Sequence, residues 1–299
     1  MDNNLLNKID EAVKVLKLAS EMSEKFYNKP LVITYSGGKD SDVLLDIALN
    51  TGISIEVVNS HTTVDAPDTV WHIKEVFEKL RKDGIPCNVL HGRTRDGVMK
   101  TMWSLIVKNG TPPTRLIRYC CRELKEVSVP KRFIATGIRQ SESSARKIRS
   151  SFETRAKKKS DAIRKSYEDT KEVFEDSKVR DEIWDCTFIK NAKENKDLIC
   201  NPILHWTDED IWAYIREKKL NVNPLYSKGY KRVGCILCPN SSKEEKIKMI
   251  KDFPKYKDNY IKAFDRMIAK RKREGKPCNW KNGEQCFYWW TELTKDDIE

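Results

Sequence analysis

A short polar turn interrupts an apolar stretch near the beginning of the chain. Residues 31–49 read LVITYSGGKDSDVLLDIAL, and the turn is Ser36-Gly37-Gly38-Lys39-Asp40-Ser41. Adjacent glycines let the backbone approach an anion without a Cβ in the way. The N–H groups at the start of a following helix favour that anion, the serines can donate hydroxyl hydrogen bonds, and the lysine adds a positive charge. The turn therefore predicts a phosphate-binding loop.

The aspartate in this turn indicates that the phosphate arrives with a metal ion. Asp40 would repel a bare phosphate unless it caps the helix or holds Mg²⁺, so a metal–nucleotide complex is favoured. A Walker loop is excluded, because Ile33 stands where its first glycine belongs and Asp40 follows the lysine in place of serine or threonine. The dinucleotide pattern Gly-x-Gly-x-x-Gly is absent as well. The alternative is an ordinary strand-to-helix turn that uses its glycines for packing.

Apolar runs alternate with helical patterns on both sides of this turn. The predicted strands cover residues 31–35, 54–60, 86–91 and 132–137, and the predicted helices cover residues 3–27, 42–50 and 68–84. Strands that alternate with helices predict an α/β fold, with a parallel sheet sandwiched by helices and with helical N- and C-terminal extensions. Ligands of such sheets bind beyond the carboxyl ends of the strands, where the turn lies.

Changes in composition divide the chain into five parts. We predict an N-terminal helix (1–29), a nucleotide-binding α/β core (30–145), a charged helical insertion (146–198), the end of the core with a Cys-x-x-Cys (199–242) and a basic helical C-terminal extension (243–299). Within the fourth part Thr207 is the expected N-cap of a helix, and Trp206 and Trp212 are expected to pack in the core.

The overall charge favours a polyanionic partner. The 299 residues carry a net charge of +12, and lysines and arginines that neutralise phosphates release counterions. A solvated lysine-rich surface is the alternative. The sequence has no run of about 20 apolar residues, so no membrane span is expected, and we expect a cytoplasmic protein. Nine cysteines in a reducing compartment favour metal binding or catalysis over disulfides, although some can be ordinary core residues.

The turn resembles the Ser-Gly-Gly-x-Asp-Ser pyrophosphate loop of the PP-loop ATP pyrophosphatases, or adenine nucleotide alpha hydrolases. Residues 61–69, HTTVDAPDT, resemble the Asp-Thr-Gly-x-x-x-Pro-Glu-Thr segment of phosphoadenosine-phosphosulfate (PAPS) reductases, with His-Thr-Thr in place of Asp-Thr-Gly. Residues 135–147, ATGIRQSESSARK, resemble the Gly-x-Arg-x-x-Glu-Ser-x-x-Arg loop of the same family, and residues 201–215 resemble a third segment of it.

This resemblance implies a set of site residues. The implied catalytic residues are Lys39, Asp40, Arg139 and Arg146. The implied nucleotide-binding residues are Ser36, Gly37, Gly38, Lys39, Asp40, Ser41, Asp65, Thr69, Gly137, Arg139, Glu142 and Ser143. The implied cofactors are ATP, which could be replaced by an adenylyl sulfonucleotide, and Mg²⁺.

Four cysteines form two close pairs. Cys120 and Cys121 are adjacent, and Cys235 and Cys238 form a Cys-x-x-Cys. The arrangement resembles the cysteines that hold a [4Fe-4S] cluster in assimilatory adenylyl-sulfate reductases, and thiolates are soft ligands that suit iron–sulfur. A structural zinc site is the competing interpretation. Cys286 lacks the Gly and His of the reductases' C-terminal Glu-Cys-Gly-x-His motif, so we expect a packed residue rather than a nucleophile.

Three functions follow from these observations. The first is a PAPS-reductase-family enzyme that acts at the α-phosphate and releases pyrophosphate in iron–sulfur-assisted sulfur transfer, in DNA phosphorothioation or tRNA thiolation. Its expected partners are an adenine nucleotide, a nucleic acid or other polyanionic acceptor, a cysteine desulfurase as sulfur donor, and a second copy in a homodimer. The second is a thioredoxin-dependent sulfonucleotide reductase. The third is a non-catalytic, nucleotide-sensing subunit that binds nucleic acid.

Overall fold

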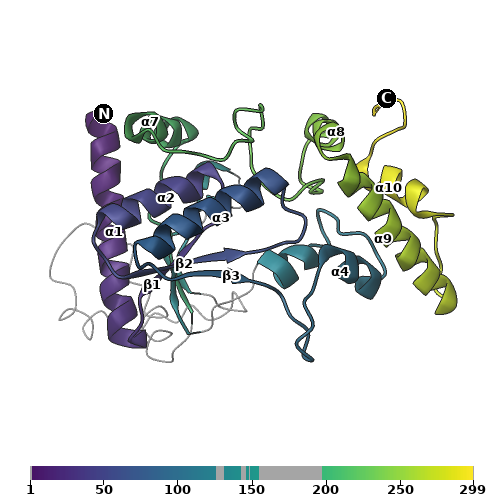
Figure 1. Cartoon of the computed structure of the whole chain (residues 1–299), viewed down its shortest axis with the longest axis horizontal. Coiled ribbons are helices and arrows are strands. Elements are labelled where there is room, and N and C mark those ends of the chain that lie inside the picture. The colour runs from purple at the N-terminus through teal and green to yellow at the C-terminus, as the bar shows by residue number, and fades with distance from the viewer. Residues whose placement is uncertain (1, 126–130, 143–145, 148, 155–196, 299) are drawn as a thin grey trace. The chain divides into compact units, whose positions relative to one another are not determined.

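A six-stranded sheet in the order β3-β2-β1-β4-β6-β5 is formed within the part of the chain that the computed structural model describes, residues 2–125, 131–142, 146–147, 149–154 and 197–298 (Figure 1). The strands are β1 (Leu31–Thr34), β2 (Ile55–Ser60), β3 (Cys87–Leu90), β4 (Phe133–Ala135), β5 (Phe152–Thr154) and β6 (Leu198–Cys200). Strand β1 is parallel to β2 and β4, and β4 is parallel to β6. The predicted α/β fold is confirmed.

One edge of the sheet differs from the prediction. Strand β5 pairs antiparallel with β6, Phe152 lying opposite Cys200, so the sheet is mixed rather than fully parallel. Antiparallel edge strands on otherwise parallel sheets are common. Strand β5 was not predicted, because it has only three residues and lies in a stretch whose many charges predicted a helical insertion.

The described residues also form helices. They are α1 (Asn3–Tyr27), α2 (Lys39–Asn50), α3 (Pro67–Lys82), α4 (Met102–Asn109), α7 (Asp208–Lys218), α8 (Lys243–Asp252), α9 (Pro254–Arg273) and α10 (Gly283–Thr291), together with a π turn, η1 (Cys121–Lys125), and a 3₁₀ turn, η2 (Gln140–Glu142). None of the described helices has both the length and the apolar character needed to cross a bilayer.

The helices begin where their capping residues place them. Asp2 accepts a hydrogen bond from Leu5 N at 2.7 Å and starts α1. Thr207 accepts from Asp210 N at 3.2 Å, while the Asp210 carboxylate accepts from Thr207 N, so the predicted cap of α7 is confirmed. Helix α2 begins at Lys39, three residues earlier than predicted, because Gly38 serves as its N-cap.

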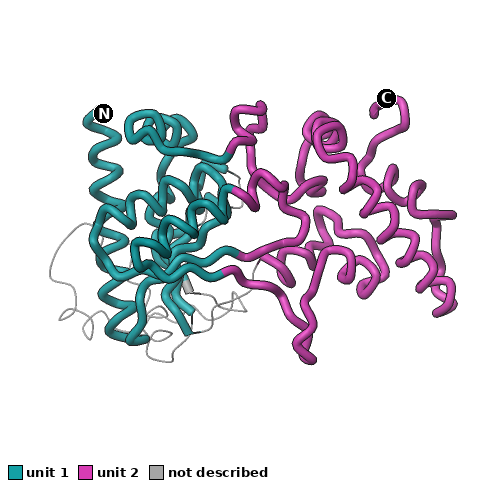
Figure 2. The backbone as a smooth tube through the Cα atoms, viewed as in Figure 1, with its two compact units in different colours: residues 1–59, 72–88, 128–223 teal, residues 60–71, 89–127, 224–299 magenta. Residues whose placement is uncertain are grey.

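The described chain divides into two units (Figure 2). Unit 1 comprises Met1–Asn59, His72–Asn88 and Ser128–Asn223, and unit 2 comprises Ser60–Trp71, Val89–Val127 and Pro224–Glu299. In unit 1, α1 packs on β1, β4 and β6, and the core contains the apolar residues of the central strands. In unit 2, α9 packs against α4, α8 and α10 around an aromatic core that includes Tyr260, Phe264 and Trp290.

The strand order places a topological switch at the centre of the sheet. From β1 the chain continues outward to β2 and β3, and it then returns to the other side of β1 to form β4. The connections that leave β1 and β4 therefore diverge, and ligands of open α/β sheets bind at the carboxyl ends of strands related in this way. The phosphate loop follows β1, and the loop that carries Arg139 follows β4.

Candidate active site

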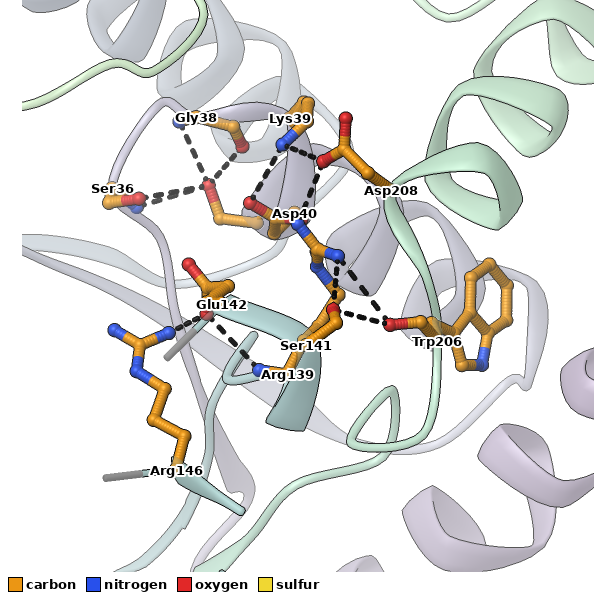
Figure 3. Close-up of polar contacts among 11 residues, drawn as sticks. Ser36, Gly38, Lys39, Asp40, Arg139, Ser141, Glu142, Arg146, Trp206 and Asp208 are labelled. Atoms are coloured by element: carbon orange, nitrogen blue, oxygen red, sulfur yellow. Dashed lines mark hydrogen bonds and ion pairs between the residues drawn. The ribbon is translucent and has the colours of Figure 1, made fainter. Parts of the chain in front are cut away.

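The predicted phosphate loop is closed by the hydroxyl of its last serine. Ser41 Oγ donates to the carbonyl of Gly38 at 2.7 Å and accepts from the backbone N–H groups of Ser36 and Gly38 at 3.3 and 3.2 Å (Figure 3). Gly37 has a φ of +71°, a conformation that a residue without a Cβ adopts without strain. Ser41 is buried, so the loop is held in shape by its own side chain.

Lys39 lies in the first turn of α2, between two carboxylates. Its ammonium is 2.8 Å from Asp208 Oδ1 and 3.5 Å from Asp40 Oδ2. The lysine is only 6% exposed, whereas the Asp208 side chain is 56% exposed. A buried cation therefore stands at the helix N-terminus, with one of its acidic partners at the surface.

Arg139, which follows β4, binds the same two carboxylates. Its Nε donates to Asp40 Oδ1 at 2.6 Å, and its Nη2 donates to Asp208 Oδ1 at 3.0 Å. Its Nη1 donates to Ser141 Oγ at 2.9 Å, and the side chain is almost fully buried. Figure 3 shows Lys39 and Arg139 converging on Asp40 and Asp208. Two cations and two acids thus balance each other beside the phosphate loop.

Asp208 is a member of this cluster that the sequence analysis did not predict. Burial raises the pKa of its carboxyl group, but hydrogen bonds and charge from Lys39 and Arg139 outweigh burial and hold the pKa below its ordinary value. In the sequence Asp208 was visible only as an acid in the first turn of a helix. Its partners lie far away along the chain, so no local pattern indicated the contact.

Two backbone contacts fix the surroundings of the loop. A Cβ at Gly137 would lie 3.3 Å from the carbonyl carbon and oxygen of Asp40, so a side chain there would require the backbone to shift slightly where the segment after β4 passes the start of α2. The Asn223 amide donates to the carbonyl of Gly37 at 2.9 Å and is buried. Gly137 was predicted from the sequence, whereas Asn223 was not.

The remaining residues of the loop after β4 contact one another. The Glu142 carboxylate accepts from Arg139 N at 3.2 Å and forms an ion pair with Arg146. Glu142 therefore shapes the loop that presents Arg139. Ser143 lies outside the described residues. Direct contact of Glu142, Ser143 and Arg146 with a nucleotide stays a prediction.

A buried polar trio supports α2 from within. Tyr35 Oη donates to Asp42 Oδ1 at 2.5 Å, and His72 Nε2 lies 3.0 Å from Tyr35 Oη and 3.2 Å from Asp42 Oδ1. Among the described residues, Asp42 Oδ2 has no hydrogen-bond partner. The trio ties the end of β1, the first turns of α2 and the middle of α3 together. None of its members was singled out from the sequence.

The four cysteines predicted as metal ligands lie in unit 2. Cys120 directly precedes η1, Cys121 is its first residue, and Cys235 and Cys238 lie in the segment that precedes α8. Cys235 is buried and the other three are partly exposed. A hydrogen bond with Cys121 and burial raise the pKa of the Cys120 thiol, and the charges of Cys121, Cys235 and Cys238 act in the same direction.

Cations accompany these thiols. A hydrogen bond from Cys120 lowers the pKa of Cys121 to about 5, and Arg118, whose Nη2 lies 3.4 Å from Cys121 Sγ, acts in the same direction against burial. The negative charge of Cys235 raises the pKa of the Lys125 ammonium above its ordinary value. Positive charge therefore stabilises the Cys121 thiolate, whereas burial raises the pKa of Cys235 despite the charge of Lys125.

The donor atoms suit an iron–sulfur cluster by type, since thiolates are its usual protein ligands. Zinc accepts four thiolates as well. As arranged, no group of three or more histidine, cysteine, aspartate or glutamate side chains within the described ranges could hold a metal ion. The assignment of the four cysteines as ligands stays a prediction.

Two residues predicted to bind the nucleotide belong to unit 2. Asp65 Oδ2 accepts from Thr62 N at 2.9 Å, and the backbone of Asp65 forms an antiparallel bridge with Cys235. Thr69 is buried near the start of α3. Asp65 therefore supports the cysteine segment, and a role for either residue in nucleotide binding stays a prediction.

Residues 30–241, which include the loop after β1 and the strands of the sheet, match the phosphoadenosine phosphosulfate reductase domain family. Since the match covers more than half of the chain, the protein belongs to this family, as its motifs predicted.

Similar sequences come from several organisms. One uncharacterized protein of Methanocaldococcus jannaschii is 29% identical over 230 residues, covering 76% of this chain and 40% of that protein. A second is 26% identical over 279 residues, covering 89% and 55%. An adenosine 5′-phosphosulfate reductase of Staphylococcus epidermidis is 39% identical over 51 residues, covering 17% and 21%. The chain spans about half the length of the two Methanocaldococcus proteins.

The solved structures that resemble this chain have TM-scores below 0.5. A PAPS reductase from Candida auris has a TM-score of 0.38 at 18% identity, covering 69% of this chain and 80% of that chain. An FMN adenylyltransferase from Candida glabrata has a TM-score of 0.44 at 15% identity, covering 80% and 68%. The U34-tRNA thiolase NcsA from Methanococcus maripaludis, solved with its [4Fe-4S] cluster, has a TM-score of 0.38 at 14% identity, covering 94% and 91%. These likenesses assign no role to any residue of this chain.

Proposed function

We propose that this protein is a PP-loop enzyme that binds ATP with Mg²⁺, acts at the α-phosphate and releases pyrophosphate. The observation that carries the proposal is the cluster of Lys39 and Arg139 with Asp40 beside the phosphate loop. Fixed cations at a helix N-terminus stabilise the charge that develops on a departing pyrophosphate. Asp40 offers a carboxylate oxygen, the type of ligand that Mg²⁺ prefers.

The residues of the cluster would change partners when the nucleotide binds. Without it, Lys39 and Arg139 neutralise Asp208 and Asp40. Phosphate oxygens compete for both cations, and this exchange leaves a carboxylate available for the metal ion that accompanies the phosphates. Catalysis then consists of positioning and charge neutralisation rather than proton transfer.

We propose that the reaction with ATP activates a nucleic acid for sulfur transfer. We assign Cys120, Cys121, Cys235 and Cys238 as ligands of a [4Fe-4S] cluster, which when bound supplies iron-coordinated sulfur chemistry. Arg118 and Lys125 offset the negative charge of the thiolates. The net charge of +12 supports a polyanionic acceptor, DNA in phosphorothioation or tRNA in thiolation, with a cysteine desulfurase as the sulfur donor.

A thioredoxin-dependent sulfonucleotide reductase is the second candidate. The 51-residue segment that resembles the Staphylococcus reductase favours it. Cys286 does not, because it is fully buried in α10 and burial raises its pKa to about 12, so it is protonated at neutral pH. Release of sulfite from adenylyl sulfate or PAPS with thioredoxin, abolished by Cys286→Ser, would support the reductase instead.

The deciding experiment measures the products of ATP. Protein purified without oxygen is incubated with ATP, Mg²⁺, sulfide and either DNA or tRNA. Pyrophosphate is expected when the acceptor takes the adenylyl group, and AMP is expected when sulfur displaces that group. Lys39→Ala should lower their formation by about 10²-fold or more, whereas Lys25→Ala, an exposed lysine of α1, should not. ADP and phosphate as products would contradict the proposal. Tight nucleotide binding without turnover would support the non-catalytic sensor.

A further inference from the structure

Unit 2 contains a surface cavity of about 470 Å³ beside the cysteine pair of η1. Its wall comes from the end of α4 and from the segment that leads to η1. The lining includes Asn109, Thr111, Leu116, Ile117, Arg118 and Arg122. Nothing in the proposed chemistry at the phosphate loop uses this cavity.

The rim of the cavity is apolar and fully open to solvent. Leu116 is 94% exposed, and its neighbour Ile117 is 49% exposed. A single exposed leucine is ordinary, but two adjacent bulky apolar residues at the mouth of a cavity indicate a surface that a ligand covers. The apolar part of that ligand would rest on these two side chains.

The wall of the cavity is strongly basic. The Arg122 side chain is 71% exposed, and its Nε lies 3.5 Å from Glu123. Arg118 uses Nη2 for its contact with Cys121 Sγ, and a guanidinium carries five N–H donors, so one such bond does not exhaust it. Two guanidinium groups in one wall could bind a phosphate, because each guanidinium can donate two parallel hydrogen bonds to two phosphate oxygens.

We propose that this cavity binds one nucleotide unit of a nucleic-acid strand. Arg118 and Arg122 contact the phosphate, Leu116 and Ile117 contact the base, and Thr111 contacts the sugar. The proposal rests on the proposed nucleic-acid acceptor and adds the place where the strand binds. A phosphate held by Arg118 lies next to Cys121, because the same guanidinium touches the cysteine sulfur.

Binding of a labelled single-stranded oligonucleotide of about 16 nucleotides, measured by fluorescence anisotropy over a range of salt concentrations, tests the proposal. Arg122→Ala should weaken binding several-fold and reduce the slope of log K against log salt by about 1. Leu116→Ser should weaken binding of the normal strand without changing this slope, and it should not weaken binding of an abasic strand of equal length. Arg216→Ala, an exposed arginine of α7 in unit 1, is the matched control and should leave affinity unchanged.

The iron content of each variant shows whether the cysteine site is intact, so loss of binding can be separated from loss of the fold. If Arg122→Ala and Leu116→Ser bind the strand as well as Arg216→Ala does while pyrophosphate release continues, the cavity is not the strand site and the proposed function stands. If the unaltered protein binds no DNA or RNA strand, the nucleic-acid acceptor is wrong and the inference falls with it. Competition by an acidic peptide, but not by AMP, would assign the cavity to a protein partner and also overturn it.

Discussion

The buried side chains of Lys39 and Arg139 are paired with the carboxylates of Asp40 and Asp208. Removing a charge from water costs free energy, and the contact with Asp208 offsets this cost for both cations. Asp40 forms a second ion pair with Arg139. The same acids must give way when a phosphate arrives. The affinity for a nucleotide therefore depends on how easily these internal pairs are exchanged.

Replacing Arg139 should lower both the stability of the fold and the release of pyrophosphate. Arg139→Ala removes the 2.6 Å partner of Asp40 and should lower the free energy of unfolding by about 2 kcal/mol, because a partly buried carboxylate loses its counterion. Arg139→Lys should recover part of this stability but little pyrophosphate release, since a lysine cannot bridge two carboxylates as a guanidinium does. Urea unfolding measures the first effect, and an unchanged midpoint for Arg139→Ala would show that the cluster does not stabilise the fold.

Asp208 should make stability depend on pH. Its pKa in the folded state lies below the ordinary value of 3.8, so its pairing stabilises the fold above that pH and the contribution is lost as the pH falls through the folded-state value. Unfolding of Asp208→Asn, compared with the unaltered protein between neutral and strongly acidic pH, should show a difference that shrinks on acidification. Glu209→Gln, in the same turn of α7, is the control. A difference that stays constant would contradict this assignment.

The sequence predicted three members of this cluster and missed the fourth. Lys39 and Asp40 belong to a local motif, and Arg139 belongs to a second one. Asp208 lies in the family-like segment 201–215 but at a position that its motif does not specify, and Asn223 carries no motif. They reach the loop only because β4 and β6 return beside β1, and that arrangement is a property of the sheet rather than of any local stretch.

At the scale of elements, the site depends on how closely the segment after β4 approaches the start of α2. The contact of Gly137 with the backbone of Asp40 leaves little room for a side chain. The supporting trio of Tyr35, Asp42 and His72 restrains the same helix through hydrogen bonds to the side chain of Asp42. The first turn of α2 is therefore confined on more than one side.

Filling this contact should harm the site in proportion to the volume added. Gly137→Ala places a methyl group 3.3 Å from Asp40 and should cost about 1 kcal/mol of stability, and Gly137→Val should cost more. Pyrophosphate release should fall in the same order, because α2 carries Lys39. Thermal unfolding and product formation measure the two effects, and full activity of Gly137→Val would show that the approach is not needed.

The elements themselves were largely predictable, and the exceptions are short or weakly patterned. The long amphipathic repeat of α1 and the strands β1 to β3 follow from apolar spacing, and their predicted bounds agree within one or two residues. Helix α4 has eight residues and β5 has three, too few for a clear period. The pairing of β5 with β6 also depends on tertiary contacts that no local pattern encodes.

At the scale of the whole molecule, the phosphate loop and the cysteines belong to different units. Each unit has its own apolar core. The metal content and the nucleotide chemistry can therefore be probed with variants that lie in different units.

Metal content should distinguish the two interpretations of the cysteines. Protein purified without oxygen should contain about four iron and four sulfide ions per chain and absorb visible light, whereas a zinc protein would be colourless. Cys235→Ser should lose most of the iron and retain ATP binding, because the phosphate loop lies in unit 1. Cys87→Ser, at a buried cysteine of unit 1, is the control and should keep the iron. Stoichiometric zinc without iron would contradict the cluster.

Asn223 combines two features. Its side-chain amide donates a hydrogen bond to the carbonyl of Gly37, and it is the residue at which the chain leaves unit 1 for Pro224. The backbone that would accommodate a triphosphate is thus held by the side chain of the last residue before the chain passes into unit 2.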